Sequence, residues 1–565
     1  MAYSILAINP GHNGSAALTV DGEVVYYTEE ERLTRFKHDG NPFRAMLQVL
    51  SVHPIDELVI GGTSEEFSTL PWTGEDAYSA LARKFYPNIK ITKMGNLHHL
   101  GHAAGAFYNS GFETAAAVII DGAGSNHSDQ IGENGPIVNG FETETIYHCS
   151  YPGEFNAVYK HYSNGIHDSM YYDNGIQEFD NSVTITKAYE AVSEYLGFGF
   201  IEAGKTMGLA PYGKFDEFIP DFFINGKGNR NLLIPRYPAG AVIDETLNPY
   251  LKRYVDPQDW HNDFTLCTDQ SKNLAFKVQQ EVEELLFKLV EKAVDITGET
   301  DVVISGGFGL NCVANYKLVK RFPQLNIYVD PIAHDGGTAI GLARYAWFKH
   351  SGDTTIKPLK TVCLGVLPDY NQLENVKLQL PDLVFSDTSA DHIAKLLESG
   401  EIVAIFQGPS EGGPRALGNR SIVFDPRNPD GKEIINSVKN REWFRPFAGS
   451  VMEEHASDWF DMDKLDNSPF MMYAVNVLPE KISQLPAITH VDNTCRVQTV
   501  NADNTHYYEL ISEFNKLTGV PVLFNTSFNL AGQPLVETII DAVLTLINSD
   551  IKYLYLPEIG QLISK

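Results

Sequence analysis

Residues 4–30, SILAINPGHNGSAALTVDGEVVYYTEE, decide the fold class of this chain. Two apolar segments, 4–9 and 15–20, flank the turn sequence PGHNG, and a third extended segment follows the Asp-Gly pair at 21–22. An Asp-Gly pair between strand-like segments is a strong hairpin signal, because both residues tolerate the positive φ angles of a tight turn. The chain is therefore predicted to begin as strand, turn, strand and hairpin.

Strand-like segments recur farther along the chain and alternate with helical patterns. The apolar segments are ELVIGG (57–62), AAAVIID (115–121), DVVISGG (301–307) and NIYVD (326–330). Residues 270–297 instead repeat apolar side chains every three or four positions, which is typical of an amphipathic helix. This alternation predicts an α/β architecture.

The length of 565 residues exceeds what one compact core needs, so we expect two or more domains. Residues 350–361, HSGDTTIKPLKT, are polar and lack apolar periodicity. We place the boundary there and predict domains 1–355 and 356–565. Residues 125–260, rich in Tyr, Asn, Asp and Gly, are expected to form an insertion of loops and short helices, and the sequence shows no internal repeat.

The charge balance narrows the possible partners. Lys and Arg number 43 against 72 Asp and Glu, a formal net charge of −29. Such a surface repels nucleic acids and anionic membranes unless a local basic patch exists. The five cysteines form no CxxC pair, which argues against a disulfide scaffold or thiolate zinc site. With no signal-peptide pattern and only strand-length apolar runs, we expect a cytoplasmic protein without a membrane span.

Two histidines in NLHHLGHAAGAFYNSGF (96–112) form a candidate metal site. This Ala-rich segment favours a helix, and His98 and His102 are four residues apart, so both imidazoles project from one face. Asp121 ends a predicted strand, and Asp335 lies in the turn AHDGGTA. Two nitrogen and two oxygen ligands suit Fe(II), Mn(II) or Zn(II) better than Ca(II). The alternative is that these are ordinary core histidines and a turn aspartate.

Two glycine-rich segments follow predicted strands and open predicted helices. In ISGGFGLNCVAN (304–315), Gly306, Gly307 and Asn311 are candidate nucleotide contacts, and DPIAHDGGTAIGLA (330–343) has the same placement. Backbone N–H groups at such turns can bind phosphate. Neither segment matches the P-loop or the dinucleotide fingerprint, so each is equally consistent with a tight strand-to-helix turn.

Residues 407–446 form a basic island in this acidic chain, with seven basic residues against five acidic ones. Arg binds phosphate in a bidentate manner and Lys adds a point charge, so the island predicts an anion pocket, the alternative being a solvated helix face. Segments 489–500 and 522–534 add polar groups at strand ends. The candidate phosphate ligands are Arg415, Arg420, Lys439, Arg441, Arg445, His490, Arg496, Asn525, Thr526 and Ser527.

A charge run, EEERLTRFKH (29–38), follows the first hairpin, and His12 lies in the turn before it. Such runs are usually solvated. Histidine is the natural acid or base near neutral pH, so His12 is a candidate catalytic residue.

Eight motifs together resemble one known family over nearly the whole chain. They are EEERLTRFKH, HHLGHAAGAF, AGKTMGLAPYG, SGGFGLNCVAN, GPRALGNRSI, REWFRPFA, THVDNTCRVQTV and VLFNTSFN. Their order and content resemble the O-carbamoyltransferase family of the nodulation-factor, cephem-antibiotic and tobramycin carbamoyltransferases.

The resemblance implies an N-terminal domain of the sugar kinase/actin-type fold, similar to tRNA threonylcarbamoyl-transferring proteins, and a C-terminal YrdC-like domain. It implies an ATP-dependent enzyme that converts carbamoyl phosphate and ATP, with Mg(II), into carbamoyl-adenylate and then carbamoylates a hydroxyl on a small polar metabolite, sugar or natural product. The residues that match family positions are the metal ligands His98, His102, Asp121 and Asp335, generally taken as iron ligands, the transfer histidine His12, and Lys37 after the EEER run.

This sequence departs from the family pattern at three positions and leaves further functions open. Asn13 stands where the family has Asp, Gly449 where Pro is usual, and Gln533 where Glu is usual. A different acceptor would be a hydroxymethylated pyrimidine in a nucleotide or in DNA, for which Lys227, Arg230 and Arg236 could supply a basic rim. A sugar kinase or ATPase would share the N-terminal fold, and a tRNA-modifying enzyme would share both chemistries, so both functions stay open at this point.

Overall fold

The computed structural model divides the chain into two units. Unit 1 comprises the chain up to Glu30 and His38–Lys360, and unit 2 comprises Glu31–Lys37 and Thr361–Lys565. The assignment of separate functions to 1–355 and 356–565 stays a prediction. The structure describes residues 2–64, 69–70, 74–131, 135–166, 171–237, 239–246, 248–251 and 267–565.

The first sheet of unit 1 has the strand order β3-β2-β1-β4-β5. The three N-terminal strands form the predicted antiparallel meander, and β4 and β5 run parallel to β1. All six residues of β1 are buried, as expected for a central strand covered on both faces. The strands are β1 (Ser4–Asn9), β2 (Ser15–Val20), β3 (Glu23–Glu29), β4 (Glu57–Ile60) and β5 (Lys90–Lys93), with helices α2 (Phe43–Leu50) and α3 (Ala77–Phe85).

A second sheet of unit 1 repeats this topology. Its central strands lie in the order β9-β8-β6-β16-β17, with two antiparallel pairings followed by two parallel ones, as in the first sheet. The duplicated order is that of the expected sugar kinase/actin-type domain, although the sequence shows no repeat. The strands are β6 (Thr114–Ile120), β7 (Asn126–Gln130), β8 (Ile137–Ser150), β9 (Glu154–Ser163), β10 (Tyr172–Asp173), β11 (Gln177–Asp180), β16 (Asp301–Ser305) and β17 (Asn326–Val329).

The prediction of loops and short helices for 125–260 is wrong where β8 and β9 run. These long strands complete the second sheet. They bury Glu142, Glu144 and His161, which pair with other polar groups. Buried charges broke the apolar alternation by which a strand is recognised, so the sequence pattern did not indicate these two strands.

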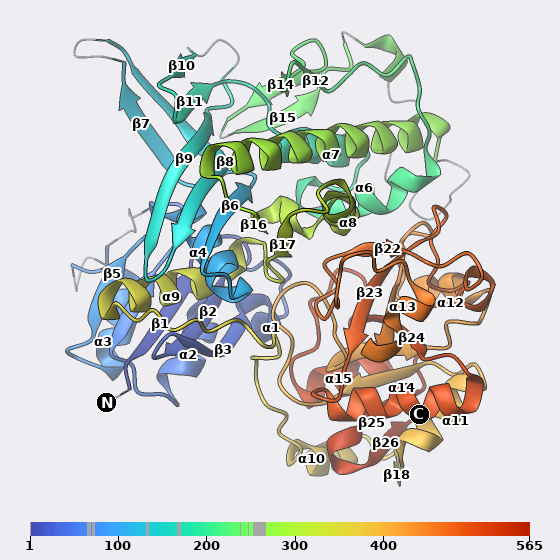
Figure 1. The fold of residues 1–565 in the computed structure, drawn as a ribbon. Coiled ribbons are helices and arrows are strands. Elements are labelled where there is room, and N and C mark those ends of the chain that lie inside the picture. The colour runs from blue at the N-terminus through green and yellow to red at the C-terminus, as the bar shows by residue number, and fades with distance from the viewer. Residues whose placement is uncertain are drawn as a thin grey trace. The chain divides into compact units, whose positions relative to one another are not determined.

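Helices α4 (His98–Ser110) and α9 (Thr338–Ser351) pack against each other, with α4 on β6 and β16 and α9 on β1 and β2 (Figure 1). A Cβ atom on Gly341 would lie 1.9 Å from the carbonyl oxygen of Gly101. Glycine at this crossing therefore lets the two helices approach closely and brings the start of α4 to the start of α9.

The remaining helices of unit 1 are grouped around α7, which itself packs on the second sheet. The long helix α7, predicted from its periodicity, contacts α5, α6, α8 and β6. These helices are α5 (Ile185–Tyr195), α6 (Ala203–Leu209), α7 (Asp269–Thr297) and α8 (Cys312–Arg321).

Unit 2 is built on one mixed sheet of nine strands in the order β18-β26-β25-β19-β20-β24-β21-β23-β22. The α/β prediction is thus confirmed for both units. The strands are β18 (Val384–Asp387), β19 (Val403–Phe406), β20 (Arg420–Phe424), β21 (Ala448–Met452), β22 (Ala474–Asn476), β23 (Thr494–Val500), β24 (Val522–Ser527), β25 (Tyr553–Leu556) and β26 (Gln561–Ser564). The helices are α10 (Gln372–Gln379), α11 (Ala390–Glu398), α12 (Gly431–Val438), α13 (Ala456–Trp459), α14 (Thr505–Thr518) and α15 (Ile539–Ile547).

Unit 2 also contains a segment from the N-terminal part of the chain. This segment is Glu31–Lys37, and helix α1 (Glu30–Thr34) lies within it except for its first residue. Arg32 in this segment is 4% exposed, so the first half of the charge run is buried, whereas Lys37 in its second half is exposed. Within the described residues, no helix is long and apolar enough to cross a membrane.

Candidate metal centre and anion site

Four predicted metal ligands meet in the interior of unit 1. His98 and His102 come from the first turns of α4, Asp121 directly follows β6, and Asp335 begins the short helical turn before α9. All four side chains are buried, and their ligand atoms lie within 4.8 Å of one another. The structure therefore brings together groups that are more than 230 residues apart in the sequence.

The distances fit a single divalent cation. The Nε2 atoms of His98 and His102 are 3.2 Å apart, and His98 Nε2 lies 3.5 Å from Asp121 Oδ2. The Oδ1 atom of Asp335 lies 3.6 Å from His98 Nε2 and 3.7 Å from His102 Nε2. Bonds of about 2.0–2.2 Å place neighbouring ligand atoms about 3.0–3.6 Å apart in octahedral or tetrahedral sites. The donor set and its spacing thus suit a first-row transition metal.

The four groups also perturb one another electrostatically. Burial opposes protonation of His98, but the carboxylates of Asp335 and Asp121 outweigh burial and raise its pKa. Burial alone would raise the pKa of Asp335, yet the neighbouring imidazoles of His12 and His98 hold it well below its ordinary value. The two carboxylates are therefore charged, and the imidazole of His98, whose pKa they raise, supplies positive charge beside them.

Backbone geometry fixes both aspartates. Gly307 N–H donates to Asp121 Oδ1 at 3.1 Å, and Gly306 before it has a φ of +90°. A Cβ atom on Gly306 would lie 2.3 Å from the Ile120 carbonyl oxygen, so only glycine fits there. The hydroxyl of Ser15 donates to the Gly336 carbonyl at 2.7 Å and holds the turn that carries Asp335. Ser15 is a supporting residue that the sequence analysis missed.

The first glycine-rich segment contributes backbone more than side chains. Gly306 and Gly307 lie beside Asp121. Asn311 accepts the N–H of Ala314 as the N-cap of α8 and exchanges hydrogen bonds with Gln279. The side chain of Asn311 thus stabilises the helix start, and its nucleotide contact stays a prediction.

His12 is the open member of the site. Its side chain is 57% exposed, and its Nε2 lies 3.4 Å from Asp335 Oδ2. The neighbouring Asn13 adopts a positive φ of 58°, and its side chain contacts His38 Nδ1 at 3.2 Å. Lys37, the second candidate catalytic residue, belongs to unit 2, so the structure does not bring it into the same unit as His12.

An ion pair on α5 lies at the same site and was not found from the sequence. Lys187 Nζ and Glu190 Oε2 are 2.6 Å apart. A Cβ atom on Gly122, the residue after Asp121, would lie 3.0 Å from Lys187 Nζ and 3.1 Å from Glu190 Oε1. Burial raises the pKa of Glu190, and the nearby Asp121 carboxylate adds to that shift. In the sequence, a Lys and a Glu three residues apart on a helix are indistinguishable from an ordinary surface ion pair.

In unit 2 the structure gathers cations of the basic island below the surface. Lys439 is 3% exposed, and its Nζ contacts the Ser527 hydroxyl at 3.1 Å and Asn529 Oδ1 at 2.9 Å. Arg441 donates to Asn436 Oδ1 at 2.7 Å. Burial lowers the pKa of Lys439 well below its ordinary value, and Arg441 and Arg445 add to this shift.

The same charges act on Arg441 and Lys432. Burial followed by repulsion from Arg445 and Arg496 lowers the pKa of Arg441. Burial and Arg441 lower the pKa of Lys432 to about 8. Lys432 also approaches His490 Nδ1 at 3.5 Å, which places that predicted ligand at the cluster. Lys432 belongs to the basic island but is not among the ligands predicted from the sequence.

Strand register places further predicted ligands next to this cluster. Ala448 on β21 is paired with Arg496 on β23 and with Asn525 on β24. Asn525 donates to Ser450 Oγ at 2.9 Å, while its Oδ1 atom is buried without a partner among the described residues. Thr526 and Ser527 follow on the same strand. The predicted polar groups therefore do lie at neighbouring strand ends.

Arg420 has a different environment from the other predicted phosphate ligands. It is fully buried and donates to backbone carbonyls, including that of Gly408 at 3.0 Å, while its guanidinium lies 3.9 Å from the Phe406 ring centroid. Through these contacts Arg420 stabilises the loop 407–419. Arg415 in that loop is partly exposed. Phosphate contacts of Arg415 and Arg420 stay predictions.

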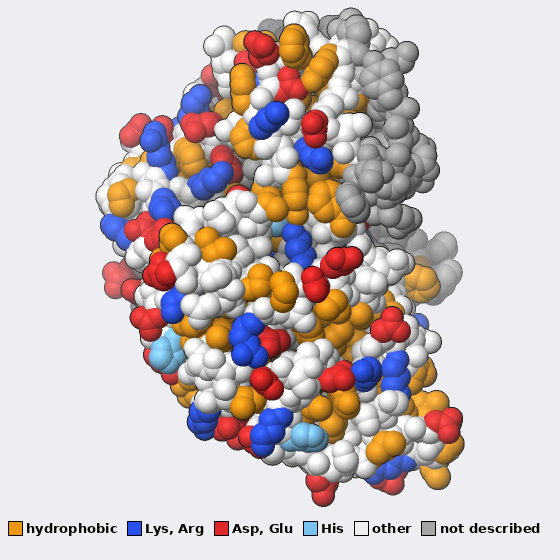
Figure 2. Space-filling view, turned by 90° about the vertical axis from the view of Figure 1, so that its right-hand side faces the viewer, with side chains coloured by type: hydrophobic (Ala, Val, Ile, Leu, Met, Phe, Trp, Pro, Cys, Tyr) orange, Lys and Arg blue, Asp and Glu red, His pale blue; other side chains and the backbone are white. Residues whose placement is uncertain are grey.

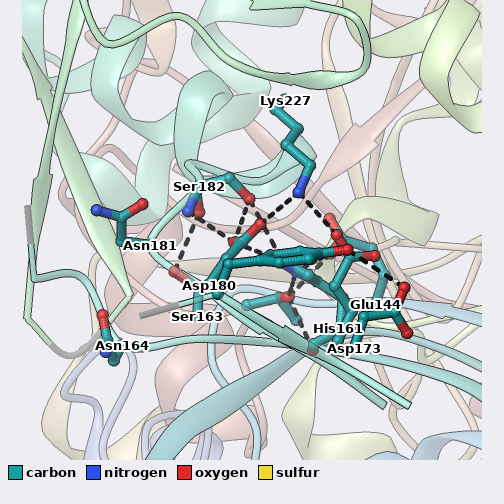
Figure 3. A network of polar contacts seen from close by, with 12 residues as sticks. Glu144, His161, Ser163, Asn164, Asp173, Asp180, Asn181, Ser182 and Lys227 are labelled. Atoms are coloured by element: carbon teal, nitrogen blue, oxygen red, sulfur yellow. Dashed lines mark hydrogen bonds and ion pairs between the residues drawn. The ribbon is translucent and has the colours of Figure 1, made fainter. Parts of the chain in front are cut away.

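A second group of metal-binding residue types, His161, Glu178 and Asp180, lies on the paired strands β9 and β11. Figure 3 shows His161 and Asp180 with their polar neighbours. His161 contacts Glu144 Oε2 at 3.1 Å and Asp180 Oδ1 at 2.9 Å. Lys227 Nζ lies 2.8 Å from Asp180 Oδ2 and 2.9 Å from Glu178 Oε1. The lysine and the imidazole already supply positive charge to these carboxylates, so this group is a structural ion-pair network.

This network bears on the basic rim considered for nucleic-acid binding. Lys227 is neutralised by two carboxylates, and Arg230 donates to the Asn181 side chain. On the face shown in Figure 2, the Lys and Arg side chains of the described residues are interspersed with Asp and Glu instead of forming one basic patch. Lys227 and Arg230 are thus engaged within the protein.

The chain matches two family models, one described as "Carbamoyltransferase N-terminus" over residues 78–344 and one as "Carbamoyltransferase C-terminus" over residues 394–563. It is 31% identical to nodulation protein NolNO of Sinorhizobium fredii, covering 96% of this chain and 77% of that protein. It is 33% identical to nodulation protein NolO of Bradyrhizobium diazoefficiens, covering 80% of this chain and 76% of that protein.

Similarity to solved structures is weaker. Full-length HypF in its phosphate- and nucleotide-bound form has a TM-score of 0.33 and 14% identity, covering 62% of this chain and 56% of that one. A ROK family glucokinase from Streptomyces griseus, in complex with glucose and AMPPNP, has a TM-score of 0.29 and 8% identity, covering 61% and 98%. At this level of similarity nothing about ligands follows for this chain.

Proposed function

This chain belongs to the carbamoyltransferase family and is a carbamoyltransferase, and from that premise we propose that it is an ATP-dependent O-carbamoyltransferase with two reaction sites. Unit 2 would form carbamoyl-adenylate from carbamoyl phosphate and ATP, which enters with Mg(II). Unit 1 would transfer the carbamoyl group to an acceptor hydroxyl.

The observation that carries the proposal is the cluster of cations in unit 2, in which Lys439 is buried and Arg441, Arg445 and Arg496 are partly exposed. Lys439 and Arg441 both have strongly lowered pKa values, caused first by burial and then by neighbouring cations. Buried like charges are unfavourable unless an anion pairs with them. A carboxylate, Glu442, contacts Arg445 at 3.4 Å and acts on the pKa of Arg441 in the opposite direction to the neighbouring cations. Carbamoyl phosphate and the triphosphate of ATP are anions that would relieve the repulsion.

In the first half-reaction, water hydrolyses carbamoyl phosphate to carbamate and inorganic phosphate. A carbamate oxygen attacks the α-phosphorus of ATP, the bond to the β-phosphate breaks, and pyrophosphate leaves with the electron pair. Lys439, Arg441, Arg445 and Arg496 bind the phosphate oxygens and balance their charge, and bidentate Arg contacts orient them. The polar groups of Asn525 and Ser527 lie on the adjoining strand end.

In the second half-reaction, His98, His102, Asp121 and Asp335 would hold a divalent metal, Fe(II) by resemblance or Mn(II) or Zn(II) by donor set. A bound metal of this kind supplies Lewis acidity to the carbamoyl group. His12, half-exposed beside Asp335, accepts the proton of the acceptor hydroxyl as its oxygen attacks the carbamoyl carbon. The bond from that carbon to the adenylate oxygen breaks, and AMP leaves.

Carbamate and carbamoyl-adenylate are labile in water, which gives a reason to carry both half-reactions on one chain. For the acceptor we propose a small polar metabolite with a hydroxyl. Pairing of Lys227 with Glu178 and Asp180 disfavours a DNA acceptor, because phosphate contacts require available cations.

Two assays test the proposal. Carbamoyl phosphate-dependent exchange of pyrophosphate into ATP reports the first half-reaction alone. Incubation with radiolabelled carbamoyl phosphate, ATP and a panel of hydroxylated metabolites and hydroxymethylated DNA reports the whole reaction. Exchange that requires carbamoyl phosphate, together with label in a small acceptor, supports the proposal. Label transfer that does not need ATP would contradict it.

A further inference from the structure

The charge run at the N-terminal side of the chain is anchored in unit 2 by two arginines. Arg32 Nη2 donates to the Gly413 carbonyl at 2.6 Å. Arg35 donates to the carbonyls of Leu535 and Pro534 at 2.5 Å and 2.9 Å. The buried guanidinium of Arg32 and the partly exposed one of Arg35 fix these carbonyls in place, since the hydrogen bonds are charge-assisted. The segment Glu31–Lys37 is therefore an integral part of unit 2.

The first anchored loop, 407–419, touches the anion site. Glu411 Oε1 accepts the N–H groups of Leu417 and Asn419 at 2.7 Å and 2.9 Å, so the loop is internally ordered. The side chain of Asn525 donates to the Ala416 carbonyl at 3.2 Å. A displacement at Gly413 would therefore be transmitted to a predicted ligand.

The second anchored loop, 528–537, holds Lys439. Asn529 Oδ1 lies 2.9 Å from Lys439 Nζ, and the N–H of Ala531 donates to the Lys439 carbonyl at 3.1 Å. The two loops meet where the Ser410 hydroxyl donates to Glu537 Oε1 at 2.9 Å. Arg32 and Arg35 thus connect to both sides of the anion site through backbone carbonyls.

The electrostatics of the junction agree with this geometry. Glu537 is fully buried, and burial raises its pKa, while Arg420 and Arg32 act in the opposite direction. Arg35 lies 3.6 Å from Asp541 Oδ1. The two arginines therefore balance carboxylates at the base of the loops as well as binding their carbonyls.

From these contacts we infer that Arg32 and Arg35 are positioning residues of the carbamoyl-adenylate-forming site, acting through the loops 407–419 and 528–537 on Asn525 and Lys439. This inference rests on the function proposed for unit 2. It assigns a role in the first half-reaction to the N-terminal charge run. The contacts that indicate this role are made with residues of the C-terminal part of the sequence.

Full-length variants test the inference with two readouts, pyrophosphate exchange and amide hydrogen exchange. Arg32→Ala should speed amide exchange in 407–419, and Arg35→Ala in 528–537. Each should lower kcat/KM for carbamoyl phosphate-dependent exchange about tenfold or more, as expected for loss of a charged hydrogen bond. Arg35→Lys keeps the charge but can serve the two carbonyls less well, and it should recover part of the activity. Arg44→Ala, an exposed arginine on α2 in unit 1, is the matched control.

Unchanged kcat/KM and unchanged loop exchange in both alanine variants would overturn the inference. If the alanine variants loosen all of unit 2, Arg32→Lys and Arg35→Lys decide it. Lysine variants with faster amide exchange in one loop only and partial kcat/KM support the inference. Lysine variants with the amide exchange and kcat/KM of the wild type contradict it. A wild-type enzyme without carbamoyl phosphate-dependent exchange would instead refute the proposed function, and the amide-exchange readout would still test the anchoring.

Discussion

The Nε2 atoms of His98 and His102 lie 3.2 Å apart and face the same two carboxylates. Two imidazole nitrogens at this distance can share only one proton directly, whereas one cation can bind both. The Nδ1 atom of His102 contacts the Ser305 hydroxyl at 3.4 Å, which leaves Nε2 directed toward the carboxylates. The helix thus presents two nitrogen ligands before any metal binds.

Replacing His102 by Ala should remove the metal and abolish transfer, because one of four ligands is lost from a buried site. Metal content per protein, measured by mass spectrometry, and transfer from supplied carbamoyl-adenylate are the readouts. Pyrophosphate exchange, which we assign to unit 2, should persist. His148→Ala serves as the control, since His148 is partly exposed and pairs with Glu299 on its own. Stoichiometric metal in the purified His102→Ala protein would refute the assignment.

Arg441→Ala should stop pyrophosphate exchange and leave transfer from supplied carbamoyl-adenylate intact. Losing one partner of a buried charged contact costs about 2–5 kcal/mol. Arg427→Ala is a suitable control from the same island, because Arg427 is engaged by Asp425 at 2.6 Å. Equal loss of both activities in a folded Arg441→Ala protein would mean that the two half-reactions do not occupy separate sites.

Gly341→Ala should weaken metal binding although residue 341 touches no ligand. Its new Cβ atom would lie 1.9 Å from the Gly101 carbonyl oxygen, which forces α4 and α9 apart and shifts His102 relative to Asp335. Overpacking of this kind costs about 1–3 kcal/mol. Metal affinity and the free energy of unfolding should both fall. Gly204→Ala, where no atom lies within 4 Å of the new Cβ, should lower neither.

The pairing of His161 predicts a pH-dependent stability. Burial opposes protonation of His161, but Asp180 and Glu144 outweigh it and raise its pKa to about 10 from 6.5. Because the folded-state pKa is raised, the stabilisation is complete below the unfolded-state value and is lost as pH rises toward the folded one. Breaking a buried pair costs about 3–5 kcal/mol. Urea unfolding should show a stability gap between wild type and His161→Gln that is largest near pH 6 and shrinks near pH 10. A constant gap would show that His161 is not held protonated.

Local rules explain why part of the site was predictable. His98 and His102 share a helix face by spacing alone, and Asp121 and Asp335 follow buried strands or turns at the same sheet end. By contrast, the burial of Arg32 depends on a carbonyl 381 residues away, and Glu190 reaches the metal site only through the placement of α5. No local pattern carries that information.

The strands of the fold were likewise predictable only where the signal was local. Strands with apolar faces, such as β1 and β6, were recognised from composition. Strands β8 and β9 were missed because their charged residues are buried against partners on neighbouring strands. The duplicated sheet order is a property of hydrogen-bond pairing, and the two halves share it without a visible sequence repeat.

The anchoring of Arg35 has a consequence for the order of events during synthesis. Its acceptor at Leu535 is 500 residues farther along the chain. At roughly 5–20 residues per second, the ribosome delivers that acceptor about 25–100 s after Arg35. For that interval the Arg35 guanidinium lacks its two carbonyl acceptors at Pro534 and Leu535, so this segment is not yet anchored. The nascent chain must therefore keep this segment available until Leu535 emerges, and unit 2 cannot close around it before then.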